Sequence, residues 1–266
     1  MTPPLPAAPL PAGPLAGLGI LVTRPARQAA GLAAKIAALG GRPVIFPAIA
    51  ILPPADSTAL SRVHAALADY DFAFFVSANA VEFGAPDPQR WPATLTAFAP
   101  GPGTAEALAA VGIPDARVPA TSFDSAGLLA LPELADVRGR RAIVFRGDGG
   151  REELAEALRA RGAAVDYVAC YRRARPTGAA GLAEAFAGHR VQAVTITSGE
   201  GLDNLWALAD DATRAAWRGV PTFVPHPRIA ARARELGLAV RETAGSDAGL
   251  IAGLLEWAAA HLPKAN

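Results

Sequence analysis

The residues best suited to chemistry stand in eight short turns, each between an apolar run and a stretch with helical spacing. The turns are TRPAR (23–27), SANA (77–80), GPGT (101–104), FDSAG (123–127), RGDGGR (146–151), TSGEG (197–201), PHPR (225–228) and GSDAG (245–249). At the start of a helix the backbone N–H groups are free and the helix dipole is positive. Each turn could therefore bind an anion.

The candidate ligand-binding residues carry a hydroxyl, amide, imidazole or guanidinium group, or an accessible backbone N–H. They are Arg24, Ser77, Asn79, Thr104, Ser125, Arg146, Gly147, Gly150, Arg151, Thr197, Ser198, Gly199, His226, Arg228 and Ser246. Each dipole contact contributes only about 0.3–1 kcal/mol, so many uncharged donors suit a large polycarboxylate better than one compact phosphate. The alternative for any single turn is ordinary helix capping, and for any single arginine a solvated surface position.

Tyr171 is the candidate acid, because a phenol is protonated at neutral pH and can donate a proton or a hydrogen bond. It lies in VACYRRARP (168–176), an extended segment that ends in proline, and we expect it to overlook any cleft. The alternative is an amphipathic residue at a strand edge. Its neighbour Cys170 is expected to be a small apolar core residue.

Several other kinds of site are not indicated. The glycine turn at 147–150 lacks the Lys-Ser/Thr ending of a P-loop, and GPGTAEAL (101–108) lacks the third glycine of a dinucleotide fingerprint. The four histidines and the single cysteine never approach metal-ligand spacing, and there is no nucleophile elbow. We expect no metal and no cofactor. A net charge of +1 does not demand a nucleic-acid partner, and no segment resembles a membrane span of ~20 apolar residues.

The elements that position these turns are repeated along the chain. Five pairs of segments match in the same order at offsets of about 120 residues, a plausible domain size. They are 17–25 with 139–147, 37–48 with 159–170, the segment around Ser77 with that around Ser198, 98–113 with 223–238, and 122–129 with 244–251. Near-continuous apolar runs such as RAIVF and AVTIT are typical of parallel strands buried on both faces. We predict two flavodoxin-like, doubly wound α/β lobes that arose by internal duplication.

The connections between the lobes are also matched. FPAIAILPP (46–54) and VACYRRARP (168–176) are extended, end in proline and suggest a two-stranded connector with a cleft between the lobes. The predicted parts are a flexible proline-rich tail at 1–14, lobe 1 at 15–48 plus 176–263, lobe 2 at 53–168, and connector strands at 47–53 and 168–176. The tail contains no basic residue and is not a signal peptide, and a single cysteine fits a reducing compartment, so we expect a cytoplasmic protein.

Taken together, the motifs resemble those of the uroporphyrinogen-III synthase family over residues 15–262. The resemblance rests on the ordered set ILVTRP, FVSANAV, GPGTAEAL, DSAGLL, RGDGGREEL, CYRR, TITSGEGLDNL and PHPRIAARARELG. It implies two α/β lobes that exchange pieces, so that the first lobe takes the opening βα segment and the last part of the chain. It also implies a cofactor-free lyase of tetrapyrrole biosynthesis, expected to be a monomer with at most transient contact with hydroxymethylbilane synthase.

The resemblance further implies the substrate and the reaction. Hydroxymethylbilane, a linear tetrapyrrole polycarboxylate, loses water at ring A to give an azafulvene cation. The substituted carbon of ring D attacks this cation, and the resulting spiro pyrrolenine fragments and recloses as uroporphyrinogen III. The anions held by the turns would be acetate and propionate groups, and Tyr171 corresponds to the family tyrosine suspected of assisting hydroxyl departure.

The chain departs from the family pattern at Val76, where relatives commonly carry threonine before the serine of SANAV. A hydroxyl contact is lost or moved there, so the second-copy pair Thr197 and Ser198 is the firmer expectation. Two alternatives stay open: a non-catalytic bilobed protein that binds a small anionic ligand, and an accessory domain that has lost activity.

Overall fold

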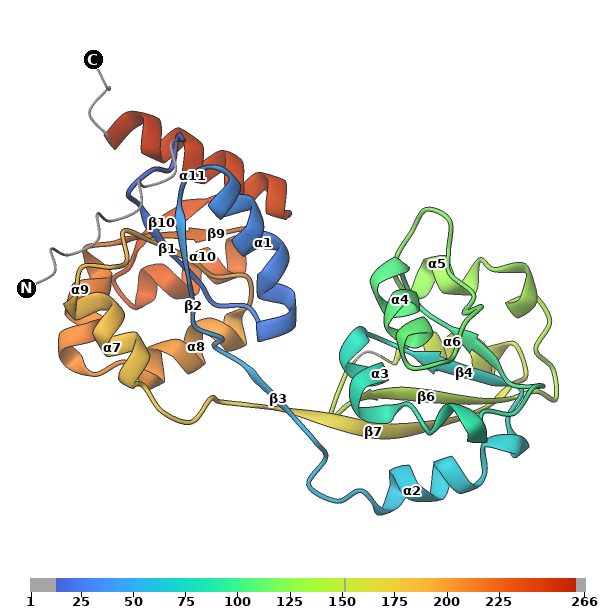
Figure 1. The fold of residues 1–266 in the computed structure, drawn as a ribbon. Coiled ribbons are helices and arrows are strands. Elements are labelled where there is room, and N and C mark those ends of the chain that lie inside the picture. Colours follow the sequence, from blue (N-terminus) through green and yellow to red (C-terminus); the bar gives the residue numbers. More distant parts are fainter. Residues whose placement is uncertain (1–12, 151, 262–266) are drawn as a thin grey trace, which may run out of the picture. The chain divides into compact units, whose positions relative to one another are not determined.

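The computed structural model describes residues 13–150 and 152–261 and divides into two compact units. The boundaries fall between Ala50 and Ile51 and between Ala174 and Arg175, so unit 1 takes both ends of the chain and unit 2 takes the middle. The chain passes from one unit to the other twice (Figure 1). Most of the tail predicted at 1–14 lies outside the described residues. Gly13 and Pro14 lead into a turn that places Leu15 in the core of unit 1.

Unit 1 is built on a five-stranded sheet in the order β10-β9-β8-β1-β2, and every neighbouring pair is parallel. Its elements are β1 (Gly19–Val22), α1 (Ala26–Ala38), β2 (Arg42–Ile45), α7 (Ala180–Ala187), β8 (Ala193–Thr195), α8 (Gly199–Leu208), α9 (Asp211–Arg218), β9 (Pro221–Val224), α10 (Pro227–Glu235), β10 (Ala239–Glu242) and α11 (Asp247–His261). Numbered within the unit, the strand order is 2-1-3-4-5, the flavodoxin-like order. The order reverses between β1 and β8, which is the topological switch point.

Unit 2 also contains a five-stranded sheet, in the order β3-β7-β6-β4-β5, in which β7, β6, β4 and β5 are parallel. Its elements are β3 (Ala50–Leu52), α2 (Thr58–Ala65), β4 (Phe72–Phe75), α3 (Ala78–Gly84), β5 (Thr96–Phe98), α4 (Pro102–Ala110), α5 (Ser125–Leu129), β6 (Arg141–Gly147), α6 (Glu153–Ala160) and β7 (Ala164–Ala174). A parallel bridge between Phe98 and Arg117 extends the sheet beyond β5. Here the switch point lies between β4 and β6.

The two sheets preserve the duplication in three dimensions. In the repeat, β1 and β2 correspond to β6 and β7, while β4, β5 and the Arg117 bridge correspond to β8, β9 and β10. The order β2-β1-β8-β9-β10 therefore matches β7-β6-β4-β5-Arg117, element for element. Each unit combines the first half of one copy with the second half of the other.

Helices cover both faces of each sheet (Figure 1). In unit 1, α1 and α11 pack on one face, and α7, α8, α9 and α10 pack on the other. In unit 2, α5 and α6 cover one face, and α2, α3 and α4 cover the opposite one. Because both faces are covered, the inner strands β1, β4 and β8 are apolar and almost entirely buried, which explains the runs seen in the sequence. Among the described residues, no helix combines the length and hydropathy needed to span a membrane.

The structure places the second connector differently from the segment 168–176 predicted from the sequence. Residues up to Tyr171 pair with β6, so the first part of that segment belongs to the sheet of unit 2. The strand β7 runs for 11 residues, with β3 beside it at the sheet edge. The physical reason is that Val168 and Cys170 are core residues, whose burial keeps this part of β7 in the sheet.

Candidate functional site

All eight turns lead into helices, and each follows a strand or a strand-like bridge. In unit 1 the turns precede α1, α8, α10 and α11, and in unit 2 they precede α6, α3, α4 and α5. Because the strands they follow are parallel within each sheet, the four turns of a unit lie at the carboxyl edge of its own sheet. This brings together Arg24, Thr197, Ser198, Gly199, His226, Arg228 and Ser246 in unit 1, and Ser77, Asn79, Thr104, Ser125, Arg146, Gly147 and Gly150 in unit 2. Arg151 lies outside the described residues.

Five of these turns are capped by their own side chains. The Oγ atoms of Ser77, Ser198 and Ser246 accept backbone N–H groups three residues ahead, at 3.2, 3.0 and 3.1 Å. The His226 Nδ1 accepts the Arg228 N–H, and the Asp124 carboxylate accepts the Gly127 N–H and so caps α5. These side chains therefore cap helices, which was the alternative considered for each turn in the sequence analysis. Each serine hydroxyl still has its proton to donate to an anion.

Two candidate side chains point into the protein instead of toward solvent. Asn79 and Thr104 are only 9% and 8% exposed. Both lie in the first turns of helices that pack on the sheet of unit 2, α3 and α4. Little of either residue is therefore accessible in this structure, and their contact with a ligand stays a prediction.

The switch point of unit 1 is held by two threonines that the motif analysis missed. The Thr23 hydroxyl donates to the Thr195 carbonyl at 2.7 Å, and the Thr195 hydroxyl donates to the Leu21 carbonyl at 2.9 Å. Both threonines are buried. These reciprocal bonds join β1 to β8 where the Arg24 and Thr197 turns begin. The signal in the sequence was a threonine at the end of each apolar run.

Arg24 is paired within its own unit. Its Nη1 lies 2.6 Å from Oδ1 of Asp247, the first residue of α11, and Lys35 lies 3.3 Å from the other carboxylate oxygen. Burial alone would raise the pKa of Asp247, but the hydrogen bonds and charges of Arg24 and Lys35 outweigh it and lower that pKa. A ligand carboxylate would have to share the guanidinium with Asp247.

This pairing makes stability depend on pH in a defined direction. Because the pKa of Asp247 is lowered by folding, its contribution is present above the unfolded pKa of about 3.9 and is lost as pH falls through the folded pKa. We expect Asp247→Asn to lower the free energy of unfolding by about 1 kcal/mol at pH 7. The deficit should shrink in acid, as urea unfolding at both pH values would measure.

Asp211→Asn is the matched control, since Asp211 is also the first residue of a helix and pairs with an arginine. Its side chain is 99% exposed, whereas that of Asp247 is 23% exposed. An exposed pair contributes little, so this variant should lose less than about 0.5 kcal/mol. Equal losses in the two variants would contradict the role given to Asp247.

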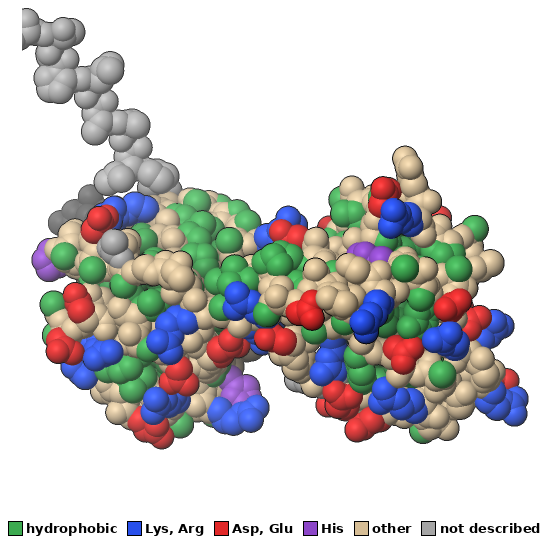
Figure 2. All heavy atoms as spheres, turned by 90° about the horizontal axis from the view of Figure 1, so that it is seen from below, with side chains coloured by type: hydrophobic (Ala, Val, Ile, Leu, Met, Phe, Trp, Pro, Cys, Tyr) green, Lys and Arg blue, Asp and Glu red, His purple; other side chains and the backbone are tan. Residues whose placement is uncertain are grey.

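Arg146, the counterpart of Arg24 in unit 2, is also neutralised. Its Nη1 lies 2.8 Å from a Glu152 oxygen, and its guanidinium stacks 4.4 Å from the centre of the Tyr167 ring. The Tyr167 hydroxyl donates to the other Glu152 oxygen at 2.6 Å. Both hydrogen bonds lower the pKa of Glu152, and the bond from Tyr167 has the larger effect. Figure 2 likewise shows acidic and basic side chains interspersed over the visible face of each unit. Arg24 and Arg146 are thus both paired with carboxylates of their own units.

The glycine turn of unit 2 ties β6 to the end of β7. The backbone N–H of Asp148 donates to the Tyr171 carbonyl at 2.9 Å, and its carboxylate accepts the Arg173 N–H at 3.2 Å. Gly149 and Gly150 then adopt φ values of 95° and 138°, a region that side chains other than hydrogen rarely allow. The turn thus holds the backbone on both sides of Tyr171.

Tyr171 lies inside the unit, not in an open connector. Its side chain is only 5% exposed, which corrects the expectation of a residue overlooking a cleft. The register between β6 and β7 slips so that Arg146 opposes Ala169 but Gly147 opposes Tyr171. This bulge puts Cys170 and Tyr171, although consecutive, into the same core cluster.

The Tyr171 ring rests on the backbone of Gly147. A Cβ atom at position 147 would lie 2.7 Å from Cε2, 2.9 Å from Cζ and 3.2 Å from the hydroxyl oxygen of Tyr171. That hydroxyl is 3.5 Å from the Ser77 Oγ, at the start of α3. The phenol is thereby aimed at the carboxyl end of β4, beside the switch point of unit 2.

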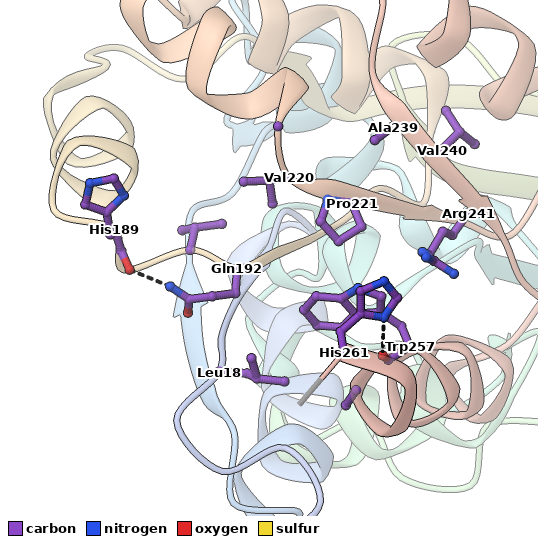
Figure 3. A pocket seen from close by; sticks show the side chains of 13 residues that line it. Leu18, His189, Gln192, Val220, Pro221, Ala239, Val240, Arg241, Trp257 and His261 are labelled. Atoms are coloured by element: carbon purple, nitrogen blue, oxygen red, sulfur yellow. Dashed lines mark hydrogen bonds between the residues drawn. The ribbon is translucent and has the colours of Figure 1, made fainter. Parts of the chain in front are cut away.

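A pocket of about 710 Å³ occupies the other edge of the unit 1 sheet. It is lined by Leu18, by the starts of β9 and β10, and by α11 side chains. Figure 3 shows Trp257 and His261 next to each other in it. Their ring centroids are 5.8 Å apart. The amino ends of the strands surround this pocket, so none of the eight turns faces it. Among the described residues, no cluster of His, Cys, Asp or Glu is arranged to hold a metal ion.

Comparison with known proteins identifies the family. The family model for uroporphyrinogen-III synthase HemD matches residues 30–248. The chain belongs to the uroporphyrinogen-III synthase family. The uroporphyrinogen-III synthases of Salmonella typhimurium and Escherichia coli are 38% and 36% identical to it, each over 87% of this chain and 98% of their own length.

Solved structures of the same family share the fold. Uroporphyrinogen-III synthetase from Helicobacter pylori aligns with a TM-score of 0.54 and 13% identity, over 91% of this chain and 98% of its own. A mutant uroporphyrinogen III synthase from Thermus thermophilus aligns with a TM-score of 0.50 and 22% identity, over 92% and 99% of the two chains. The predicted α/β architecture is confirmed.

Proposed function

We propose that the chain is a uroporphyrinogen-III synthase that closes hydroxymethylbilane with inversion of ring D and loss of water. The observation that carries the proposal is the pair of duplicated sheets, each with four helix starts at its carboxyl edge, in a chain of this family. Eight acidic side chains on one substrate need many donors, and the backbone N–H groups of these turns supply them without a large positive charge.

Binding would accelerate the rearrangement by orientation. With acetate and propionate groups held by the donors of these turns, the substituted carbon of ring D is the atom presented to ring A. The competing attack through the unsubstituted carbon gives the type I isomer, and it occurs spontaneously. The donors therefore determine the isomer as well as the rate.

Tyr171 would supply the proton for the first step. Its hydroxyl transfers a proton to the ring A hydroxyl, the carbon–oxygen bond breaks, and water and an azafulvene cation form. After ring D has attacked through its substituted carbon, the spiro intermediate fragments and the macrocycle closes through the unsubstituted α-carbon of ring D. The proton lost from that unsubstituted carbon restores the phenol. The 3.5 Å distance from this hydroxyl to the Oγ of Ser77, an N-cap residue, supports the proposal.

The decisive experiment is incubation with hydroxymethylbilane, oxidation of the products and separation of the isomers. We expect type III to predominate, whereas a protein-free reaction gives type I. A chain that binds the polycarboxylate but leaves only type I would be the non-catalytic anion binder, and one that does neither would be an inactive relative. The lyase class, the monomeric state, transient contact with hydroxymethylbilane synthase and the cytoplasmic location stay predictions.

A further inference from the structure

Exposed large hydrophobic side chains gather at the edges that carry the turns. Within the described part of the chain, those classed as exposed are Ile45, Val76 and Phe123. Ile45 ends β2, Val76 directly follows β4, and Phe123 directly precedes the N-cap of α5. Single exposed apolar residues are ordinary, but their shared location at strand carboxyl ends indicates a ligand with apolar faces.

Phe123 is the largest of the three and is held in a defined place. Phe123 is 57% exposed. It nevertheless packs closely on Gly101: a Cβ atom added to that glycine would lie 3.3 Å from the Cβ and 3.4 Å from the Cγ of Phe123. The base of the ring therefore rests on the turn that begins α4. Val76 follows β4, and Gly101 follows β5. These two strands are paired neighbours in the sheet. The two apolar side chains thus belong to neighbouring positions on one sheet edge.

The loop that carries Phe123 is built tightly around it. The Asp124 carboxylate accepts the Ser122 hydroxyl at 2.9 Å and the Gly127 N–H at 2.8 Å. A Cβ at Gly127 would lie 1.7 Å from the Ser122 carbonyl oxygen, so only glycine permits this approach. The ring is consequently presented to solvent from an ordered backbone.

The repeated unit offers an independent comparison. Gly249 corresponds to Gly127, and a Cβ there would lie 2.3 Å from the Ala244 carbonyl oxygen, so the two loops have the same tight approach. In unit 1 the residue equivalent to Phe123 is Gly245, while the one equivalent to Gly101 is the exposed His226. Each unit therefore has one exposed ring at this position. In unit 2 it is Phe123, from the loop before α5, and in unit 1 it is His226, from the turn before α10.

We propose that Phe123 is a substrate-contact residue whose ring packs against the flat face of one pyrrole ring of the bound tetrapyrrole. The inference rests on the proposed function. The backbone amides bind the carboxylates at the periphery of the substrate, and the aromatic ring of Phe123 packs against the face of a pyrrole ring. Val76, which is also exposed, extends the same surface. Phe123 takes no part in proton transfer, so it acts on binding.

The test is steady-state kinetics with hydroxymethylbilane on Phe123→Ala and Phe123→Tyr. We expect KM to rise about tenfold in Phe123→Ala with kcat changed less than about threefold, because a contact present before and during the reaction is lost. Phe123→Tyr retains the ring and should keep KM within about twofold. The melting temperature should stay within about 2 °C, since an exposed side chain contributes little to stability.

An unchanged KM in Phe123→Ala, with wild-type protein forming type III, would overturn the inference and leave the proposed function intact. If wild-type protein forms only type I, the function itself fails. Should Phe123→Ala melt more than about 5 °C lower, Phe123→Leu decides, because it keeps apolar bulk without the aromatic face. A raised KM at normal stability in Phe123→Leu supports the contact, and a normal KM contradicts it.

Discussion

Replacement of Tyr171 by phenylalanine should lower kcat about 100-fold while leaving the fold unchanged. A positioned general acid contributes roughly 10²–10⁴-fold, and the substitution removes only the hydroxyl. Within the described part of the chain, the hydrogen-bonding neighbour of that hydroxyl is the Ser77 Oγ at 3.5 Å, a long contact, so little stability is lost with it. The measurement is the rate of type III formation, with thermal unfolding beside it. Because bilane that is not turned over closes spontaneously, type I should accumulate.

Tyr70→Phe is the matched control for this variant. The chain has three tyrosines, and Tyr70 precedes β4 at the opposite, amino edge of the same sheet. Its hydroxyl donates to Asp166 at 2.9 Å; burial first, and then this bond, raise the pKa of Tyr70 to about 12. Removing it should cost about 1 kcal/mol of stability and leave kcat unchanged. Normal turnover in Tyr171→Phe would remove Tyr171 from the role of acid.

The second large effect is expected from Gly147→Ala. The added methyl group would meet the Tyr171 ring at 2.7–3.2 Å, and the ring is enclosed by its core cluster, so the phenol must move. We expect kcat to fall about 100-fold, together with a loss of roughly 1–3 kcal/mol of stability from overpacking. Rate and urea-unfolding measurements on the purified variant give both numbers. Gly147, proposed from the sequence as a ligand-binding residue, thus becomes a positioning residue for Tyr171.

Two comparisons separate positioning from general damage. Gly31→Ala introduces the same methyl group in α1, where nothing lies within 4 Å, and should stabilise the helix by about 0.5–1 kcal/mol without affecting turnover. In the double variant Gly147→Ala, Tyr171→Phe, kcat should be no lower than in Tyr171→Phe alone, because both changes remove the same hydroxyl from its place. Additive losses would show that Gly147 acts independently of the tyrosine.

The sequence predicted well whatever depends on neighbouring residues. Apolar runs such as that at β6, followed by a short turn, marked most of the strands and the starts of eight helices, because strand burial and capping are local requirements. The duplication could also be recognised from the sequence, because each copy needs the same pattern of apolar strands, turns and helix starts. It indicated two similar lobes, and the exchange of halves between them was expected only from the family resemblance.

Side-chain environments were predicted less well, because they depend on residues far apart in the chain. Arg24 is neutralised by Asp247, more than 220 positions away, and no spacing rule links the two. Asn79 and Thr104 are almost fully buried, because the helices that carry them pack on the sheet. The sequence motif marked these residues as polar and near a helix start, and it contained nothing about the direction in which they point.

What the sequence by itself determined is the series of strands, turns and helices, together with their repetition. The tertiary structure alone decided that a one-residue bulge in β7 buries Tyr171 against Gly147, and that Phe123 stands exposed on Gly101. The reason is physical: periodicity and capping act within a few residues, whereas a side chain's burial, charge partner and aim result from contacts that exist only once distant segments share a sheet.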